Sequence, residues 1–403
     1  MTTTAAAHTP LRSGMAAGAL AIRGGEDSAF FKLMNMADQV ENVIRLGRGE
    51  PDRPTPQHVI DAAVWALQNG KTTYTNPAGL PELRQAIAKK FRDDNGLEYS
   101  PFGEIIVTSG AQEAMVVALQ TLLDPGDEVI IASPHYMAYP ANILLAGGKP
   151  ILVPTYEEQG FELLPGAIEE RITNRTKLVV LVSPNNPTAG VLTAETMEGI
   201  SKVIEKHDLL AISDELYEKI VYEDFEPVSF ATLPGMRERT ITINGFSKAY
   251  SMTGLRVGYM AGPEDYMKAA LEPRHSLTIC AATPSQYAAL AALEGPADFL
   301  VDMLAEYSKR RATMAAAFDD MGVSYSPPLG GFYFFANIKE AGISSYEFCE
   351  KALLEHGLLF TPGSLFGDAG EGFVRIGYLA PEDELNEALD RFASLWNELT
   401  ATK

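Results

Sequence analysis

The chain has 403 residues, of which 46% are hydrophobic, and its 53 acidic side chains outnumber its 32 basic ones to give a net charge of −21. This length supports a large hydrophobic core and normally more than one domain. A surface of this charge repels nucleic acid phosphates and anionic membranes, so we expect neither as a partner.

Cysteine and histidine usage limits the metal and disulfide chemistry of the chain. The two cysteines, Cys280 and Cys349, are too far apart for a CxxC or zinc spacing, and the six histidines show no HExxH pattern. We therefore expect no metal site and no disulfide framework. Residues 1–25 lack the pattern of a secretion signal, and no apolar run has the length of a membrane span. We predict a flexible N-terminal tail on a cytoplasmic protein.

The first hundred residues predict helices around one short strand. Thr55 and Pro56 fit the N-cap and first position of a helix whose apolar face runs from Val59 to Leu67. In chain order the elements expected here are a helix at 30–40, a strand at 43–46, the helix that begins at Thr55–Pro56, and a helix at 81–94.

Strands alternate with helices through the middle of the chain. Each strand is a nearly continuous apolar run, as in a sheet that helices cover on both faces. This alternation predicts βαβ units and a mostly parallel sheet. The expected strands are at 104–108, 128–132, 150–154, 177–182, 209–213, 239–243 and 257–260, with helices at 111–123 and 193–206 among them.

The predicted pattern of elements changes after about residue 295, where long amphipathic helices surround short strands. Helices are expected at 299–321, 346–356 and 381–399, and a strand at 372–378. We interpret this part as a smaller α+β domain. The predicted organisation is a tail at 1–25, a small domain formed by 26–55 and 296–403, and a large domain at 56–295.

One lysine follows a predicted strand in the large domain. Ser247 and Lys248 come shortly after the strand at 239–243, on a loop where open α/β sheets bind their ligands. A lysine in such a crevice loses its proton more easily than one in water, because burial disfavours the ammonium form. Lys248 is therefore a candidate Schiff-base nucleophile. Taken alone, such a lysine is more often an ordinary surface residue.

Other polar residues share this position near the end of a strand, and the carboxyl ends of parallel strands converge on one crevice. The start of the helix at Ser109–Gln112 offers N–H groups and a positive dipole end that suit a phosphate. That segment, like Asp214, also fits an ordinary helix cap. Arg375 is the only charge in its strand and needs a carboxylate from the protein or from a ligand.

Taken together, these motifs resemble the class I and II aminotransferases, which are pyridoxal-phosphate (PLP) enzymes of fold type I. The resemblance covers about residues 40–400. It implies an α/β fold with a mostly parallel sheet between helices in the large domain and a smaller α+β domain. The matching motifs, in the family's order and spacing, are Gly49-Glu50-Pro51-Asp52, Tyr74 with Pro77-Ala78-Gly79, Asn185-Asn186-Pro187-Thr188, Asp214-Glu215-Leu216-Tyr217, Ser247-Lys248 with Arg256, and Arg375.

The activity that the resemblance implies is transfer of an amino group from an L-amino acid to a 2-oxo acid through a Schiff base on Lys248. The expected acceptor is 2-oxoglutarate. Other outcomes on the same cofactor, namely β-elimination, decarboxylation or oxidation, stay open because they share the same contacts with it. A transcription regulator on the same fold is disfavoured by the acidic charge of the chain.

The resemblance also implies roles for individual residues. The catalytic ones are Lys248 as proton carrier, Asp214 as partner of the pyridine nitrogen, and Tyr217, which with Asn186 hydrogen-bonds the ring oxygen. Tyr136 stacks on the ring. The phosphate is bound by Gly110, Ala111, Gln112, Ser247 and Arg256.

Two further implications concern the substrate and a second subunit. Arg375 holds the substrate α-carboxylate in a bidentate fork, assisted by Gly49 and Asn186. Tyr74 reaches the phosphate in the neighbouring subunit, which implies a homodimer with shared active sites.

The chain departs from the family pattern in three places. Ala189 stands where the family usually has glycine, Gly245 stands where some members have a phosphate-binding serine, and the segment at 24–31 matches no expected stretch. Side-chain specificity is therefore open. The candidates are Arg45, Arg48 and Arg274 for an acidic substrate, and Tyr136, Phe332 and Tyr333 for an aromatic or aliphatic one.

Overall fold

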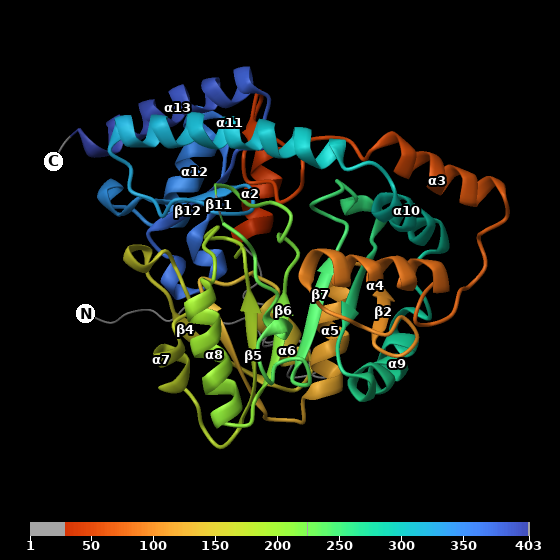
Figure 1. Cartoon of the computed structure of the whole chain (residues 1–403). Helices are drawn as coiled ribbons and strands as arrows, with labels where there is room; N and C mark the ends of the chain where they lie inside the picture. Colours follow the sequence, from red (N-terminus) through yellow and green to blue (C-terminus); the bar gives the residue numbers. More distant parts are fainter. Residues whose placement is uncertain (1–28, 224, 402–403) are drawn as a thin grey trace, which may run out of the picture.

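The computed structural model describes residues 29–223 and 225–401, so the tail predicted at 1–25 lies outside the described residues. A broad sheet with helices on both sides forms the lower part of the molecule in Figure 1, and a smaller unit of helices around short strands lies above it. Helix α11 (Asp298–Met321) runs along the top of the molecule from the smaller unit toward the far end of the sheet.

The large sheet has seven strands in the order β2-β8-β7-β6-β5-β3-β4. All run parallel except β8, which pairs antiparallel with both β2 and β7. This confirms the predicted mostly parallel sheet. The strand bounds are β2 Ile105–Thr108, β3 Glu128–Ser133, β4 Lys149–Pro154, β5 Thr176–Val182, β6 Leu210–Asp214, β7 Thr240–Gly245 and β8 Gly258–Ala261.

Alternate side chains of the strands enter cores on opposite faces of the sheet. In β3, Val129 and Ile131 pack into one core and Ile130 into the other. Full burial of each such side chain stabilises the fold by about 2 kcal/mol. The helices against the first face are α5 (Ala111–Leu122), α6 (Tyr139–Leu145) and α9 (Glu264–Thr278); those against the second are α4 (Pro81–Asn95), α7 (Pro165–Glu169), α8 (Ala194–Lys206) and α10 (Thr283–Glu294).

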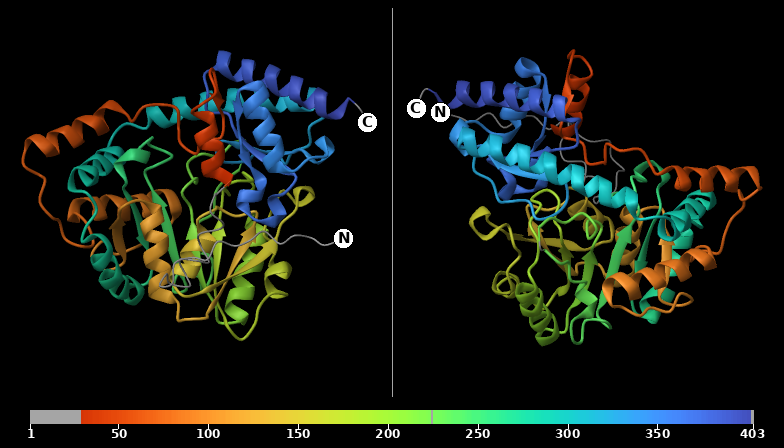
Figure 2. Two further views of the ribbon diagram at one scale, coloured as in Figure 1. Left: turned by 180° about the vertical axis from the view of Figure 1, so that it is seen from behind. Right: turned by 45° about the horizontal axis from the view of Figure 1, so that its top comes forward.

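The smaller unit joins the two ends of the described chain. One core contains Leu33 and Ala37 together with side chains from the last hundred residues, and Figure 2 shows the red N-terminal helix beside the blue C-terminal elements. We propose on this basis that the described residues of the predicted segments 26–55 and 296–403 form one domain and 56–295 the other; residues 26–28 and 402–403 lie outside the described residues. The elements are α2 (Ala29–Ala37), β1 (Ile44–Arg45), β9 (Tyr333–Asn337), α12 (Ser345–His356), β10 (Leu358–Leu359), β11 (Thr361–Pro362), β12 (Phe373–Gly377) and α13 (Glu382–Thr400).

One local prediction is wrong. Thr55 does not cap helix α3 (Gln57–Gln68), because its hydroxyl donates instead to the carbonyl oxygen of Ser251 at 2.6 Å. The helix itself forms as predicted, and on its apolar face Val59 is buried whereas Ile60, Val64 and Leu67 expose 37%, 43% and 55% of their surface. Spacing identifies an apolar face but does not say what covers it.

Two helix ends have well-defined caps. The Thr193 side chain caps α8 by accepting from the Thr196 N–H at 3.2 Å, and α4 ends at Gly96 in the left-handed conformation. Among the described residues, no helix combines the length and the apolar character needed to cross a membrane.

A carboxylic acid is buried beside the central strand β6. One oxygen of Glu215 accepts hydrogen bonds from the hydroxyls of Ser213 and Ser229, both at 2.8 Å, and from the Phe230 N–H at 3.2 Å. Burial, followed by the nearby Glu218 carboxylate, raises the pKa of Glu215 to about 7. Between about pH 4.5 and pH 7 the folded protein therefore keeps a proton on Glu215 that the unfolded chain releases.

We expect Glu215→Gln to change how stability depends on pH. Because the folded pKa lies above the ordinary value, the Glu215 carboxyl lowers the free energy of unfolding as the pH rises from about 4.5 to 7. The variant lacks this titration, so its free energy of unfolding relative to wild type should rise by about 3 kcal/mol between pH 5 and 8. Denaturant titrations measure it, with the exposed Glu205→Gln as the charge-matched control. A constant difference across this range would contradict the expectation.

Candidate active site

A cavity of about 500 Å³ lies where the C-terminal ends of the parallel strands meet the smaller unit. The large sheet contributes the ends of β5 and β6 and the loop after β7, and the smaller unit contributes β10, β11 and β12. The segment at 45–50 completes the wall. The predicted site residues that line this cavity are Gly49, Ala111, Gln112, Tyr136, Asn186, Asp214, Tyr217, Ser247, Lys248, Arg256 and Arg375.

Two predicted site residues lie outside the cavity wall. Gly110 lies just behind it, with its backbone in the left-handed region at φ 87°. A Cβ atom on Gly110 would come within 2.6 Å of Nη2 of Arg256, so only glycine allows this approach. Tyr74 is 77% exposed and belongs to no part of this cavity.

Lys248 reaches the middle of the cavity from the loop that follows β7. Its Nζ donates to the carbonyl oxygen of Gly49. Burial lowers the pKa of Lys248 to about 8, and the charge of Arg375 acts in the same direction. A substantial fraction of this amine is therefore neutral near physiological pH, which is what a nucleophile or a proton acceptor requires.

Asp214 faces the cavity from the end of the central strand β6. Its Oδ2 accepts from the hydroxyl of Tyr139 at 2.6 Å, and its Oδ1 accepts from the Leu216 N–H at 3.2 Å. Burial raises the pKa of this carboxyl above its ordinary value. A cationic N–H group of a ligand would reverse that shift, because an opposite charge favours the carboxylate.

An anion site is formed where α5 begins. The first N–H groups of a helix have no intrahelical acceptor, and the helix dipole adds positive potential there. Arg256 brings its guanidinium against Gly110 and is itself held by a hydrogen bond from Nη1 to the carbonyl oxygen of Thr253 at 3.0 Å. Ala111 and Ser247 line the same region. These donors suit a phosphate group.

Arg375 is a buried guanidinium with only neutral partners. It is 5% exposed on β12, and its Nη atoms donate to Oδ1 of Asn186 at 2.7 Å and to the carbonyl oxygen of Gly47 at 2.9 Å. The rings of Tyr333 and Phe366 lie 4.3 and 5.0 Å from its guanidinium carbon. Its Nε has no partner, and no carboxylate pairs with it within residues 29–223 and 225–401. A charge in this setting requires an anion from a ligand.

The remaining predicted residues surround these groups. The Tyr217 hydroxyl lies 3.4 Å from that of Tyr333. Asn186 accepts from Arg375 through its side-chain oxygen. Tyr136 packs edge-on against Tyr139, with ring centroids 5.5 Å apart. All three side chains thus have partners that fix them at the cavity wall.

Some of the specificity candidates are placed elsewhere. Arg45 and Arg48 line the cavity. Arg274 does not: it is fully buried, and it donates to the carbonyl oxygens of Val107, at 3.1 Å, and of Ile279. Phe332 and Tyr333 are core residues that do not line the cavity.

Sequence reasoning missed several contributors. Tyr139 holds Asp214, and the carbonyl oxygen of Gly47 holds Arg375. Gly49 was expected at the substrate carboxylate, but its contact with Lys248 was not expected. The one signal that pointed to Tyr139 is its position three residues after Tyr136, at the start of α6. Backbone carbonyls carry no sequence signal, because every residue has one.

The turn that contains Ala189 keeps a glycine-like shape. Ala189 is buried at φ 56°, in the left-handed region that disfavours residues with a Cβ atom. The turn is closed by the Ala189 N–H to the Asn185 carbonyl oxygen at 2.9 Å and by the Asn185 N–H to the Gly190 carbonyl oxygen at 2.8 Å. The substitution therefore adds local strain and leaves Asn186 on the cavity wall.

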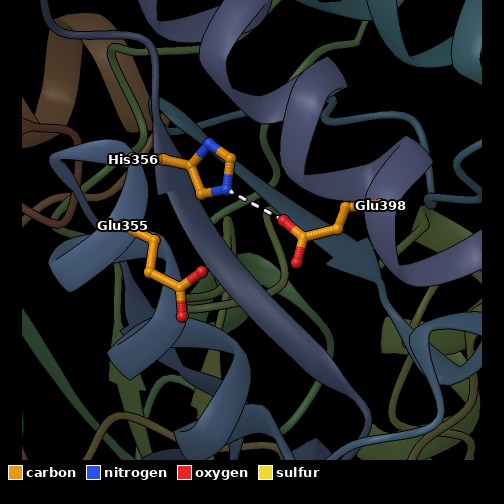
Figure 3. A group of neighbouring side chains, drawn as sticks. All are labelled: Glu355, His356 and Glu398. Atoms are coloured by element: carbon orange, nitrogen blue, oxygen red, sulfur yellow. Dashed lines mark ion pairs between the residues drawn. The ribbon is translucent and has the colours of Figure 1, made fainter.

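A second group of charged side chains lies away from the cavity, at the C-terminal end of α12. Figure 3 shows His356 turned toward Glu398, with Nε2 3.5 Å from a carboxylate oxygen, and Glu355 beside them. The ammonium of Lys351 pairs with both carboxylates, at 2.5 Å from Glu355 and 2.9 Å from Glu398. A metal ion would have to displace this ammonium, so the cluster is an internal ion-pair network.

The chain is similar to known proteins over most of its length. The model of the aminotransferase class I and II family matches residues 41–392. The aromatic-amino-acid aminotransferase 2 of Thermococcus litoralis is 41% identical over 91% of this chain and 95% of its own. The aspartate aminotransferase of Pyrococcus abyssi is 42% identical over 92% and 96%. The solved aromatic aminotransferase from Pyrococcus horikoshii OT3 superposes with a TM-score of 0.87 at 41% identity, covering 91% of this chain and 99% of that one.

The amine of Lys248 should react with an unusual pH dependence. In the protein without any ligand, modification by an amine-selective sulfonate should reach half its maximal rate near pH 8, since below that pH the amine is protonated. Peptide mapping of the modified lysine measures the profile. Arg375→Met should move the midpoint upward, because the guanidinium charge lowers the Lys248 pKa. A midpoint near the ordinary 10.5 in wild type would show that Lys248 is not desolvated.

Proposed function

Because this chain belongs to the class I and II aminotransferase family and is an aminotransferase, we propose that it moves the amino group of an L-amino acid to a 2-oxo acid, with 2-oxoglutarate as acceptor. We also propose PLP as its cofactor and the cytoplasm as its location. The observation that carries the proposal is the shared cavity of Lys248 and Arg375, a partly neutral amine facing a buried guanidinium that lacks an anion.

The residues of the cavity fit PLP group by group. Arg256 and the start of α5 would bind its phosphate, and the absence of a side chain at Gly110 lets the Arg256 guanidinium approach the start of that helix. Asp214 would accept a hydrogen bond from the ring nitrogen, and Tyr136 would lie against the ring. Lys248 would hold the cofactor through its amine. When bound, PLP supplies an electron sink for the negative charge that develops at the substrate Cα.

The protein's own groups then perform binding and proton transfer. Arg375 grips the α-carboxylate with two N–H groups, which fixes the substrate in one orientation. Lys248 would accept the proton from the substrate Cα and would also serve as the proton donor that completes the transfer, since its pKa near 8 suits both directions. Tyr139 keeps the Asp214 carboxylate in place through its hydrogen bond. Asn186 and Tyr217 would donate to the ring oxygen of the cofactor.

Substitution of Lys248 tests the proposal directly. Purified wild-type protein should be yellow, and borohydride should attach PLP covalently to Lys248. Lys248→Ala should lose transamination by at least about a thousandfold, because it removes the proton carrier. The exposed Lys206→Ala is the matched control, since Lys206 pairs with Glu169 far from the cavity wall. Transamination by Lys248→Ala at the wild-type rate would refute the assignment, and release of pyruvate with ammonia would indicate β-elimination instead.

We further propose a homodimer in which Tyr74 completes the active site of the neighbouring subunit. Tyr74 is exposed and takes no part in its own cavity. The exposed apolar face of α3, formed by Ile60, Val64 and Leu67, precedes it in the chain and supports the same assignment, because apolar faces of this kind are typical of protein interfaces.

Mixing two inactive variants tests this arrangement. In a dimer of one Lys248→Ala and one Tyr74→Ala subunit, one site carries both defects and the other carries none. Refolding the variants together should therefore restore about a quarter of wild-type activity, since half of the dimers are hybrids with one intact site. If Tyr74 serves its own subunit, no mixture will exceed the activity of Tyr74→Ala alone.

A further inference from the structure

The segment Gly47–Gly49 passes between the two main cations of the cavity. The Gly47 carbonyl oxygen accepts from Nη2 of Arg375 at 2.9 Å, and the Gly49 carbonyl oxygen accepts from Nζ of Lys248. Arg48 stands between these two anchored residues. Its backbone is therefore held on both sides, while its side chain is exposed and lines the same cavity.

Among the residues that the structure describes, five cationic side chains line the cavity, and they differ in their partners. Arg45 is already paired with Asp38 at 2.9 Å, and Lys248 with a backbone carbonyl. Arg256 and Arg375 have no carboxylate partner within the described chain, and the proposed function gives each an anion, the cofactor phosphate and the substrate α-carboxylate.

Arg48 is the one of these five cations to which neither the described structure nor the proposed function gives a partner. In the part of the chain that the structure describes it makes no hydrogen bond and no ion pair. The acidic side chain nearest in sequence, Glu50, accepts instead from the Thr253 hydroxyl at 3.1 Å. An arginine that has no partner among residues 29–223 and 225–401, in a protein of net charge −21, offers a third anion site in the cavity.

We propose that Arg48 binds the second carboxylate of dicarboxylic substrates, both the amino acid and the 2-oxo acid, and so sets the preference of this enzyme for them. The inference rests on the proposed function, because the α-carboxylate must occupy Arg375. The same cavity is also lined by the apolar side chains of Leu33, Met34 and Phe360, which can cover the methylene groups between the two carboxylates. With a monocarboxylic substrate the Arg48 side chain extends to solvent and contributes nothing.

The test compares two classes of substrate on the holoenzyme. Steady-state rates are measured with L-aspartate and 2-oxoglutarate as the dicarboxylic pair and with L-phenylalanine and pyruvate as the monocarboxylic pair. Arg48→Leu should lower kcat/KM for the dicarboxylic pair on the order of 10- to 100-fold, mainly through KM, because it removes a charge-assisted hydrogen bond. The monocarboxylic pair should change by less than about twofold. Arg48→Lys should keep part of the dicarboxylate preference, since the charge remains without the fork.

A matched control separates contact from long-range attraction. Arg92→Leu on α4 removes one positive charge from an exposed position away from the cavity. It should leave both substrate pairs unchanged. The role of Arg48 would be overturned if Arg92→Leu lost as much kcat/KM for the dicarboxylic pair as Arg48→Leu. It would also be overturned if Arg48→Leu lost kcat/KM equally for both pairs, or lost none for either pair. If wild type transaminates neither pair, the proposed function fails and not this inference alone.

Discussion

A positive charge buried without an acidic partner is the constraint on which this cavity depends. Removing the guanidinium of Arg375 from water costs several kcal/mol unless something compensates for the lost solvation. The protein provides an amide oxygen, a backbone carbonyl and two aromatic faces, all of them neutral. This environment makes the charge tolerable and leaves it free to attract an anion. A carboxylate supplied by the protein would have stabilised the fold and closed the site.

The same charge acts on the neighbouring lysine. Burial and the Arg375 guanidinium both disfavour the ammonium form of Lys248, and the two groups are linked through one stretch of backbone, Gly47 to Gly49. Binding of an anion at Arg375 would cancel part of this repulsion and raise the Lys248 pKa, which prepares the amine to accept a proton once the substrate has arrived. Substrate binding and base strength are therefore coupled by electrostatics alone, without any movement of the fold.

The sequence predicts those site residues whose positions follow from the order and direction of the strands. Asp214, Ser247 and Lys248 follow apolar strand runs, and parallel strands bring their ends to one edge, so the sequence alone is enough to expect their convergence. The contacts made by Tyr139, Gly47 and Gly49 could not be expected in this way, because they depend on where a loop and an N-terminal segment cross the cavity. The misassigned Thr55 has the same origin: a hydroxyl that could cap its own helix is used by a segment 196 residues away. Local sequence patterns indicate which local structures and hydrogen bonds are possible, and tertiary contacts determine which of them form.

The family pattern accounts for only part of the positive charge in the cavity. The motifs that carry the resemblance include Arg256 and Arg375, and each has a natural anion in the proposed reaction. They do not include Arg48, which directly precedes the motif Gly49-Glu50-Pro51-Asp52. Holding it costs little while it is exposed, since water solvates the free guanidinium. Its attraction becomes useful when a second carboxylate approaches and water leaves the cavity, because the effective dielectric constant then falls. Selectivity placed at the exposed rim in this way can vary among relatives without disturbing the buried groups that perform the chemistry.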